Sequence, residues 1–133
     1  MLPLDLKAAR TLVRRVRRVT LVLVVAALGY LFVRFDLVRL PEEGCSPLYA
    51  VPPGSLLVVD LRPRPLASGD IVLYRDGDGV LLLGRVDEPP VAGTPPGSLW
   101  VATDATGCPT RDSNTMGALS REAVAGRVMY VQR

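Results

Sequence analysis

Few residue types in this sequence could carry acid–base, nucleophilic or metal chemistry. The chain of 133 residues contains no histidine, and Lys7 is its only lysine. These absences exclude histidine-based zinc sites, Ser-His-Asp triads and Cys-His dyads, and they confine any lysine chemistry to Lys7. No metal ion or cofactor is expected. Six carboxylates remain as alternative bases, and such residues are usually turn residues or solvated charges. They are Asp60, Asp70, Asp87, Glu88, Asp104 and Asp112.

The basic residues are concentrated near the N-terminus. Five arginines follow Lys7 within a short segment, at Arg10, Arg14, Arg15, Arg17 and Arg18. The net charge of +3 arises from this cluster, because the rest of the chain is close to neutral. A charge distribution of this kind does not indicate a nucleic-acid-binding surface, and no nucleic-acid partner is expected.

An apolar segment follows the basic cluster. Val19–Val33 contains no charged residue, and the arginines at its two ends can place their head groups at the membrane interfaces. A helix from about Val16 to Val38 (residues 16–38) would cross a bilayer with the basic N-terminus in the cytoplasm. Residues 1–40 are therefore predicted to be a cytoplasmic basic segment and transmembrane anchor of a single-pass inner-membrane protein, and residues 41–133 an extracytoplasmic domain.

A cleaved secretory signal is the alternative to a retained anchor, because it has the same basic start and apolar middle. The apolar run continues past Ala26 and Ala27, and no small-x-small cleavage site follows it. A lipoprotein anchored at Cys45 is excluded, since the three residues before this cysteine do not form a lipobox.

The outer domain reads as mainly β, with short apolar runs between Gly- and Pro-rich turn signals. The predicted strands are residues 56–61, 71–75, 80–86, 99–102 and 124–131. Short strands without an amphipathic helix indicate a small β-barrel or sandwich. The two cysteines, Cys45 and Cys108, are compatible with one disulfide or with two unpaired side chains.

Four stretches of this domain carry a family resemblance. They are Ser46 to Val59 with Gly54, the turn and strand 68–74, the segment 82–86, and Asp104 with 110–117 and 124–128. In order and spacing these stretches resemble the bacterial type I signal peptidases. These are membrane-anchored serine endopeptidases that cleave signal or leader peptides from exported proteins. The resemblance covers most of residues 45–131 and implies an all-β catalytic domain, here without the subdomain that larger members insert between residues 86 and 99.

The resemblance also assigns the site residues. It places the nucleophile at Ser46 and a supporting hydroxyl at Thr110, but the position of the general-base lysine is occupied by Gly84. Arg85 cannot replace that lysine, because a guanidinium stays protonated. The residues that the resemblance places beside the site are Arg85, Asp104, Asp112, Ser113 and Gly117, and Asp112 is expected to pair with Arg85.

In the family's fold, the loop of the nucleophile and the loop before Asp112 border the active site. The resemblance therefore implies a Cys45–Cys108 disulfide, with Cα atoms about 4.4–6.8 Å apart. It also predicts that the segments around residues 46, 84 and 112 converge on one groove.

Several functions stay open at this stage. The leading interpretation is a signal peptidase-like protein in which Gly84 replaces the general-base lysine, with a remaining role in binding an extended peptide by strand addition along Leu56–Val59 and Leu81–Leu83. A working endopeptidase with an unrecognised base is the enzymatic alternative. A scaffold β-domain of a membrane complex is the other, and an autoprotease of the repressor type is disfavoured by the anchor.

Overall fold

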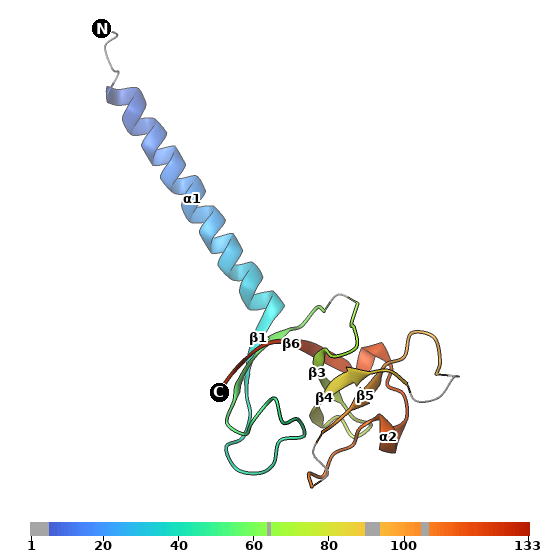
Figure 1. Ribbon diagram of the computed structural model, residues 1–133. Coiled ribbons are helices and arrows are strands. Elements are labelled where there is room, and N and C mark those ends of the chain that lie inside the picture. Colours follow the sequence, from blue (N-terminus) through green and yellow to red (C-terminus); the bar gives the residue numbers. More distant parts are fainter. Residues whose placement is uncertain (1–5, 64, 90–93, 105–106) are drawn as a thin grey trace. The chain divides into compact units, whose positions relative to one another are not determined.

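A long helix and a six-stranded sheet make up the chain (Figure 1). The computed structural model describes residues 6–63, 65–89, 94–104 and 107–133, with side chains from Ala9 onward. The chain divides into two compact units, Met1–Arg34 and Phe35–Arg133. Residues 90–93, in the connection where an inserted subdomain is expected to be missing, lie outside the described residues.

The helix α1 spans Leu6–Arg34. Its segment Ala9–Arg34 is long and apolar enough to cross a membrane, and a signal sequence would share this property. The predicted apolar helix is confirmed, but its predicted bounds, Val16–Val38, are wrong. The helix begins earlier and ends at Arg34, because the residues after it pair with another strand and their backbone groups are used in the sheet.

All strand pairs in the sheet are antiparallel, in the order β1-β2-β6-β3-β4-β5. The strands are β1 (Phe35–Arg39), β2 (Leu56–Asp60), β3 (Ile71–Arg75), β4 (Leu81–Asp87), β5 (Trp100–Ala102) and β6 (Val124–Gln132). The five predicted strands are confirmed within a residue at their ends. The strand β1 was not predicted, since its apolar residues were assigned to the helix.

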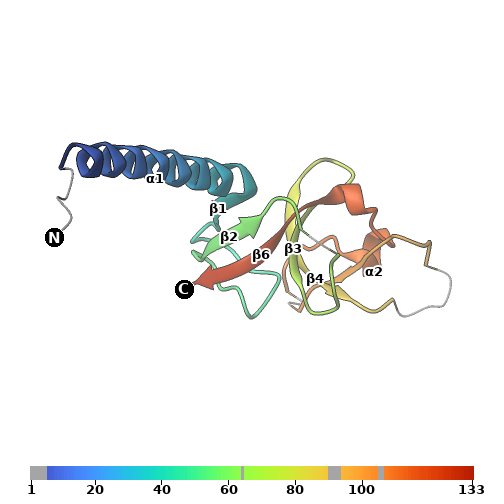
Figure 2. The ribbon, with the colours of Figure 1, turned by 90° about the horizontal axis from the view of Figure 1, so that it is seen from above.

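The last strand, β6, lies in the middle of the sheet and joins its two halves. Its first half pairs with β3 and its second half with β2, and the pairing register shifts in both places. Figure 2 shows β6 curving between these two neighbours. Because this central strand is the last one in the sequence, the sheet requires long-range pairing across most of the unit Phe35–Arg133.

Two hydrophobic clusters pack on opposite faces of β3. Leu73 faces a cluster with Leu57 and Val59 of β2, which the loop between β1 and β2 covers with Leu48 and Val51. The neighbouring side chains of β3 face the second cluster, which the fully buried Tyr74 and Val101 join with Leu99 and Leu119. Because side chains alternate along a strand, β3 is buried on both faces and fixes the positions of its neighbours.

Candidate functional site

A largely apolar cavity of about 280 Å³ opens beside β4 in the unit Phe35–Arg133. Three segments that are far apart in the sequence line it: the loop at Cys45 and Pro47, the strand residues Leu81–Leu83, and the loop Cys108–Arg111. Leu40 and Tyr74 complete the lining. The segments expected to converge around residues 46, 84 and 112 thus border one cavity, although these three residues themselves are not in its lining.

The cavity lies where β4 has no second partner strand. The short strand β5 pairs only with Arg85–Asp87, so among the described residues Leu81–Leu83 pair with β3 alone. The ladder stops because the chain turns away after β5, where the Asp104 N–H donates to the Pro47 carbonyl over 2.8 Å. This hydrogen bond leaves the first half of β4 as an open edge.

The backbone groups of Leu81 and Leu83 point toward this open edge. Val86 exchanges backbone hydrogen bonds of 2.8 Å with the segment before β3. Because backbone groups alternate between the two neighbours of an antiparallel strand, Leu82 and Gly84 also face β3, whereas the odd-numbered residues face the other side. The edge therefore presents the N–H and C=O groups with which an added strand pairs.

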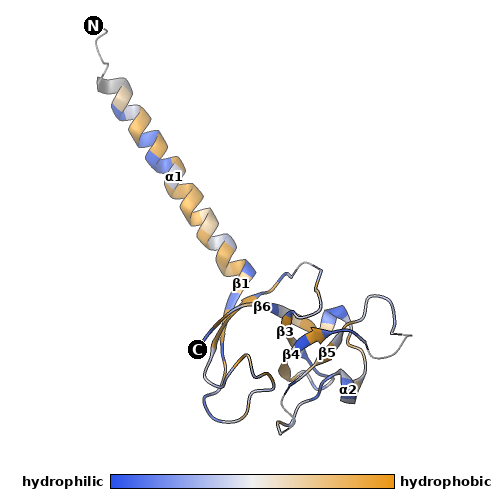
Figure 3. Ribbon diagram, in the orientation of Figure 1, coloured by the Kyte–Doolittle hydropathy of each residue, from blue (hydrophilic) through white to orange (hydrophobic). Residues whose placement is uncertain are grey.

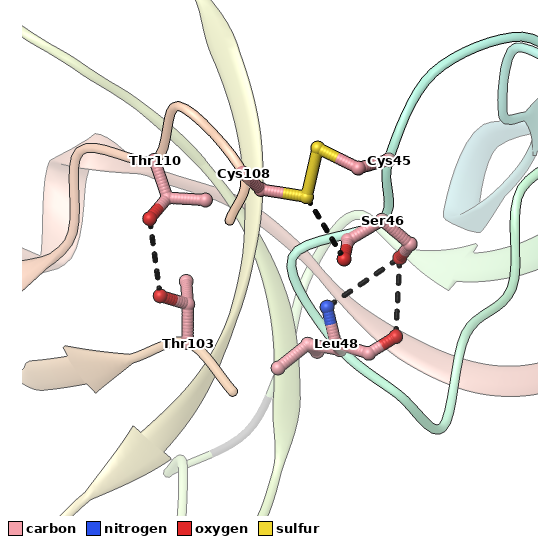
Figure 4. Close-up of a disulfide and its surroundings, with 6 residues drawn as sticks. All are labelled: Cys45, Ser46, Leu48, Thr103, Cys108 and Thr110. Carbon is pink, nitrogen blue, oxygen red and sulfur yellow. Dashed lines mark hydrogen bonds between the residues drawn. A yellow bond between two sulfur atoms is a disulfide. The ribbon is translucent and has the colours of Figure 1, made fainter. Parts of the chain in front are cut away.

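The hydroxyl of Ser46 is engaged within its own turn. It donates to the Leu48 carbonyl over 3.1 Å and lies 3.4 Å from the Leu48 N–H. Figure 4 shows these contacts on one side of the disulfide. No basic or acidic side chain hydrogen-bonds to Ser46 in the described part of the chain, so nothing there activates the hydroxyl as a nucleophile.

The position of the absent lysine, Gly84, faces a filled region of the interior. A Cβ atom built on Gly84 would lie 2.3 Å from Val101 Cγ1 and 3.1 Å from the ring of Tyr74. Any side chain at this position requires Val101 to move, because real Cβ contacts are longer than this distance. Gly84 is therefore fixed by close packing between β4 and β5.

The expected pairing of Asp112 with Arg85 is wrong. Arg85 forms a two-pronged ion pair with Asp104, at 2.5 and 3.3 Å, on the adjoining end of β5. The reason is topological, since the pairing of Arg85 with Ala102 brings the Asp104 carboxylate beside the guanidinium. Asp112 is left to bind neutral donors.

Asp112 organises the segment that follows the cavity wall. It is buried, and its carboxylate accepts from the Asn114 N–H at 3.0 Å and so caps the short helix α2 (Ser113–Met116). The hydroxyl of Ser113 accepts from the Val101 N–H at 2.8 Å and joins this helix to β5. Gly117 ends the helix with a φ of 81°, a conformation that favours glycine.

A hydroxyl chain connects Asp112 to the cavity. The Thr103 hydroxyl donates to the Asp112 carboxylate over 3.1 Å and lies 3.2 Å from the Thr110 hydroxyl. Since the single proton of Thr103 is used on the carboxylate, Thr110 must be the donor in the second bond. Thr110 lines the cavity, and its hydroxyl oxygen keeps lone pairs that can accept a further hydrogen bond.

The predicted disulfide is confirmed. Cys45 and Cys108 are bonded, with Cα atoms 5.7 Å apart, and join the loop of Ser46 to the loop of Thr110 (Figure 4). Cys108 Sγ also lies 3.3 Å from the Ser46 carbonyl oxygen. This is a contact and not a hydrogen bond, because a disulfide sulfur carries no proton.

Tyr74 and Arg111 hold the loop Cys108–Arg111, which forms one wall of the cavity, against β3 and the turn that follows it. The Tyr74 hydroxyl donates to the Arg111 carbonyl over 2.9 Å, and the Arg111 side chain bridges Asp76 and Asp78 in the turn between β3 and β4. Burial raises the pKa of Tyr74 to about 12, with smaller contributions from Asp112 and Asp76. The tyrosine is therefore neutral and a hydrogen-bond donor across the physiological range.

Several residues of this site were not singled out from the sequence. Thr103, Tyr74 and Arg111 lie in or beside the stretches that carry the resemblance, but no role was assigned to them, and only their contacts show their part in the cavity wall. The continuous apolar run at Leu81–Leu83 did indicate this strand edge. The expectation that Leu56–Val59 offers a free edge is wrong, because β2 is paired on both sides, with β1 and β6.

In the described part of the chain, no group of three or more His, Cys, Asp or Glu side chains is placed to hold a metal ion.

A scan against models of protein families finds no match to this chain, and a search of curated proteins finds no similar sequence. The resemblance to type I signal peptidases thus rests on the sequence stretches alone and stays a prediction.

Proposed function

We propose that this chain is a membrane-anchored, signal peptidase-like protein that binds an extended peptide at the open edge of β4 without hydrolysing it by Ser/Lys chemistry. In this proposal α1 is retained as a single-pass anchor of the cytoplasmic membrane, with the N-terminus inside and the β unit outside. The peptide is a signal or leader segment of an exported protein, as the family resemblance implies. The observation that carries the proposal is the open edge at Leu81–Leu83 beside an apolar cavity.

The edge supports binding of an extended backbone. The outward groups of Leu81 and Leu83 supply main-chain hydrogen bonds, and the cavity accepts a side chain that the added strand directs into it. Its lining is mostly Leu, Pro and disulfide, which favours small or branched apolar side chains. The Thr110 hydroxyl adds one fixed acceptor for an N–H of the peptide.

The geometry at Ser46 and Gly84 supports binding in place of catalysis. The serine hydroxyl is satisfied inside its own turn, and the space next to Gly84 is occupied by Val101. Loss of a general base typically lowers a rate about 10²- to 10⁴-fold. A bound peptide would therefore remain intact for much longer than on an active peptidase.

N-methylated peptides test strand addition directly. The full chain in detergent micelles is titrated with a fluorescent, leader-like peptide of the Ala-x-Ala type, and binding is followed by anisotropy. N-methylation removes one backbone donor at a time. We expect affinity to fall at alternate positions and to persist at the positions between them. Equal effects at every position, or none, would contradict the proposal.

A matched pair of variants tests the cavity. Leu81 and the neighbouring Val80 are both exposed, but Leu81 lines the cavity and Val80 does not. We expect Leu81→Gln to weaken peptide binding about fivefold, because it places an amide in an apolar wall, and Val80→Gln to change it less than twofold. Similar effects of the two substitutions would place the binding site elsewhere.

Cleavage of the same peptides decides between the binding protein and a working endopeptidase. Mass spectrometry of overnight incubations is expected to show intact peptide for the wild-type chain and for Ser46→Ala. Cleavage that Ser46→Ala abolishes would establish the protease instead. Gly84→Lys alone is expected to overpack against Val101, so an added base is tested in the double variant Gly84→Lys with Val101→Ala.

A further inference from the structure

The first half of α1 is not uniformly basic, because its arginines lie on one side. At 100° per residue, Arg10, Arg14, Arg15, Arg17 and Arg18 fall within an arc of about 160°. The opposite arc holds Leu12, Val13 and Val16, all exposed in the chain by itself. Figure 3 shows hydrophilic and hydrophobic residues alternating along this half of α1, before the more uniformly hydrophobic half.

The apolar side of this segment continues the apolar part of the helix. Val19–Val33 rises about 22 Å at 1.5 Å per residue, which is shorter than the hydrocarbon layer of about 30 Å. The stretch from Leu12 to Val33, which is apolar on one side throughout, rises about 33 Å and matches this thickness. A spanning α1 would therefore bury Leu12, Val13 and Val16 at the edge of the hydrocarbon and hold the arginines at the level of the lipid phosphates.

We propose that the arginine side of residues 10–18 binds the phosphates of anionic phospholipids in the cytoplasmic leaflet while its apolar side enters the bilayer. This inference rests on the proposed membrane anchoring by α1. Charge complementarity selects the partner, since five guanidinium groups lie on one half of the helix circumference and each can bind a phosphate through two parallel hydrogen bonds. Arg14, Arg17 and Arg18 line one hollow on this side, with Leu21 beside them.

The experiment measures which lipids surround the full-length protein. The chain is reconstituted in vesicles of phosphatidylcholine with about one-third phosphatidylglycerol, and spin-labelled lipids of each kind report their association with the protein. We expect about threefold selectivity for phosphatidylglycerol over phosphatidylcholine at low salt, reduced toward onefold in about 1 M salt. Extraction by alkaline carbonate is measured in parallel, because it tests the anchor by itself.

A scrambled helix is the matched control. The exchanges Val13→Arg with Arg14→Val and Val16→Arg with Arg17→Val keep composition and net charge but move two arginines to the apolar side. We expect this variant to remain carbonate-resistant and to lose most of its lipid selectivity. Equal selectivity of the wild-type and scrambled chains would overturn the proposal, as would an anchored wild type without selectivity. Carbonate extraction of the wild type would instead contradict the anchor.

Site-directed labelling gives a second readout. The two native cysteines are joined in a disulfide, so Leu12→Cys or Thr11→Cys introduces a single free thiol for a spin label. Leu12 lies on the apolar side and Thr11 among the arginines. In anionic vesicles we expect oxygen to relax the label at position 12 and a water-soluble nickel chelate to relax the label at position 11. Equal access of both reagents to both labels would refute the insertion of the apolar side.

Discussion

Ser46 and Thr110 lie in the two loops that the Cys45–Cys108 disulfide joins, yet the structure uses their hydroxyl groups differently. The Ser46 hydroxyl is bonded to Leu48, two residues away, and closes a local turn. The Thr110 hydroxyl is linked through Thr103 to the buried carboxylate of Asp112. Ser46, which the family resemblance selects as the nucleophile, thus hydrogen-bonds only within its own turn among the described contacts. Thr110, in the loop across the disulfide, belongs to a hydrogen-bond network.

This difference shows that position in a motif does not by itself supply chemistry. A hydroxyl becomes a nucleophile only when a base lies within hydrogen-bond reach, and the described surroundings of Ser46 contain none. The network at Thr110 ends on a carboxylate, and its proton direction leaves the Thr110 oxygen able to accept a further hydrogen bond. The arrangement is suited to holding a ligand N–H, and this suits the proposed peptide binding.

Removal of the disulfide is expected to have the largest effect on stability, because the disulfide joins the loop of Ser46 to the loop of Thr110. The cysteines are 63 residues apart. We expect Cys45→Ala with Cys108→Ala to lower the free energy of unfolding by about 4 kcal/mol. Urea titration in detergent, followed by the fluorescence of the single tryptophan, Trp100, measures this loss. A change below about 1 kcal/mol would show that the hydrogen bond from Asp104 to Pro47 holds the loops without the disulfide.

Alkaline pH should destabilise the fold around the loop of Thr110, because it deprotonates Tyr74, which donates to the Arg111 carbonyl in that loop. The folded pKa of about 12 lies above the unfolded value of 10.0, so the stabilisation is complete below pH 10 and is lost as the pH rises from 10 to 12. The expected loss is about 2 to 3 kcal/mol. Urea midpoints across this range measure it, and Tyr74→Phe should flatten the dependence. An unchanged slope in that variant would assign the effect to another group.

Asp112 and Ser46 offer a direct contrast in stability. We expect Asp112→Ala to cost about 2 kcal/mol, because it removes the cap of α2 and the acceptor of Thr103. Ser46→Ala should cost less than about 1 kcal/mol, since it removes hydrogen bonds within one turn only. Thermal unfolding of the two variants side by side measures the difference. Equal losses would mean that the turn at Ser46 is as important to the fold as the network.

The smallest expected effect concerns peptide affinity. Thr110→Val keeps the shape of the side chain and removes the acceptor, so we expect peptide binding to weaken about fivefold. Ser46→Ala should leave the same affinity unchanged. Anisotropy titrations with one fluorescent peptide compare the two variants. A greater loss in Ser46→Ala would assign the peptide contact to the serine loop.

Much of the fold could be predicted from local patterns. Turn signals and apolar runs located five strands, because buried strands leave short apolar runs and the Gly- and Pro-rich turns between them mark where each run stops. The strand β1 was missed for a physical reason: its apolar residues follow the helix without a turn signal, and their pairing partner lies far along the chain. The same apolar pattern could not show that Leu56–Val59 is paired on both sides.

The candidate site was predictable in outline and less so in its contacts. The loops of Cys45 and Cys108 were predicted to be joined by a disulfide, and this prediction is confirmed. The partner of Arg85 was not predictable, because Asp104 reaches it only through the register of β4 with β5. The close packing of Val101 on Gly84 depends on the same register.

The amino-acid sequence by itself determined that histidine chemistry is absent and that lysine chemistry is confined to Lys7, because these follow from composition alone. It also determined the apolar helix and most of the strands, which follow from hydropathy and turn residues. Only the tertiary structure decided which strand edge is open, which acid meets Arg85, and which hydroxyl joins the network of Asp112. These features depend on strand order and register, and local sequence patterns do not encode them.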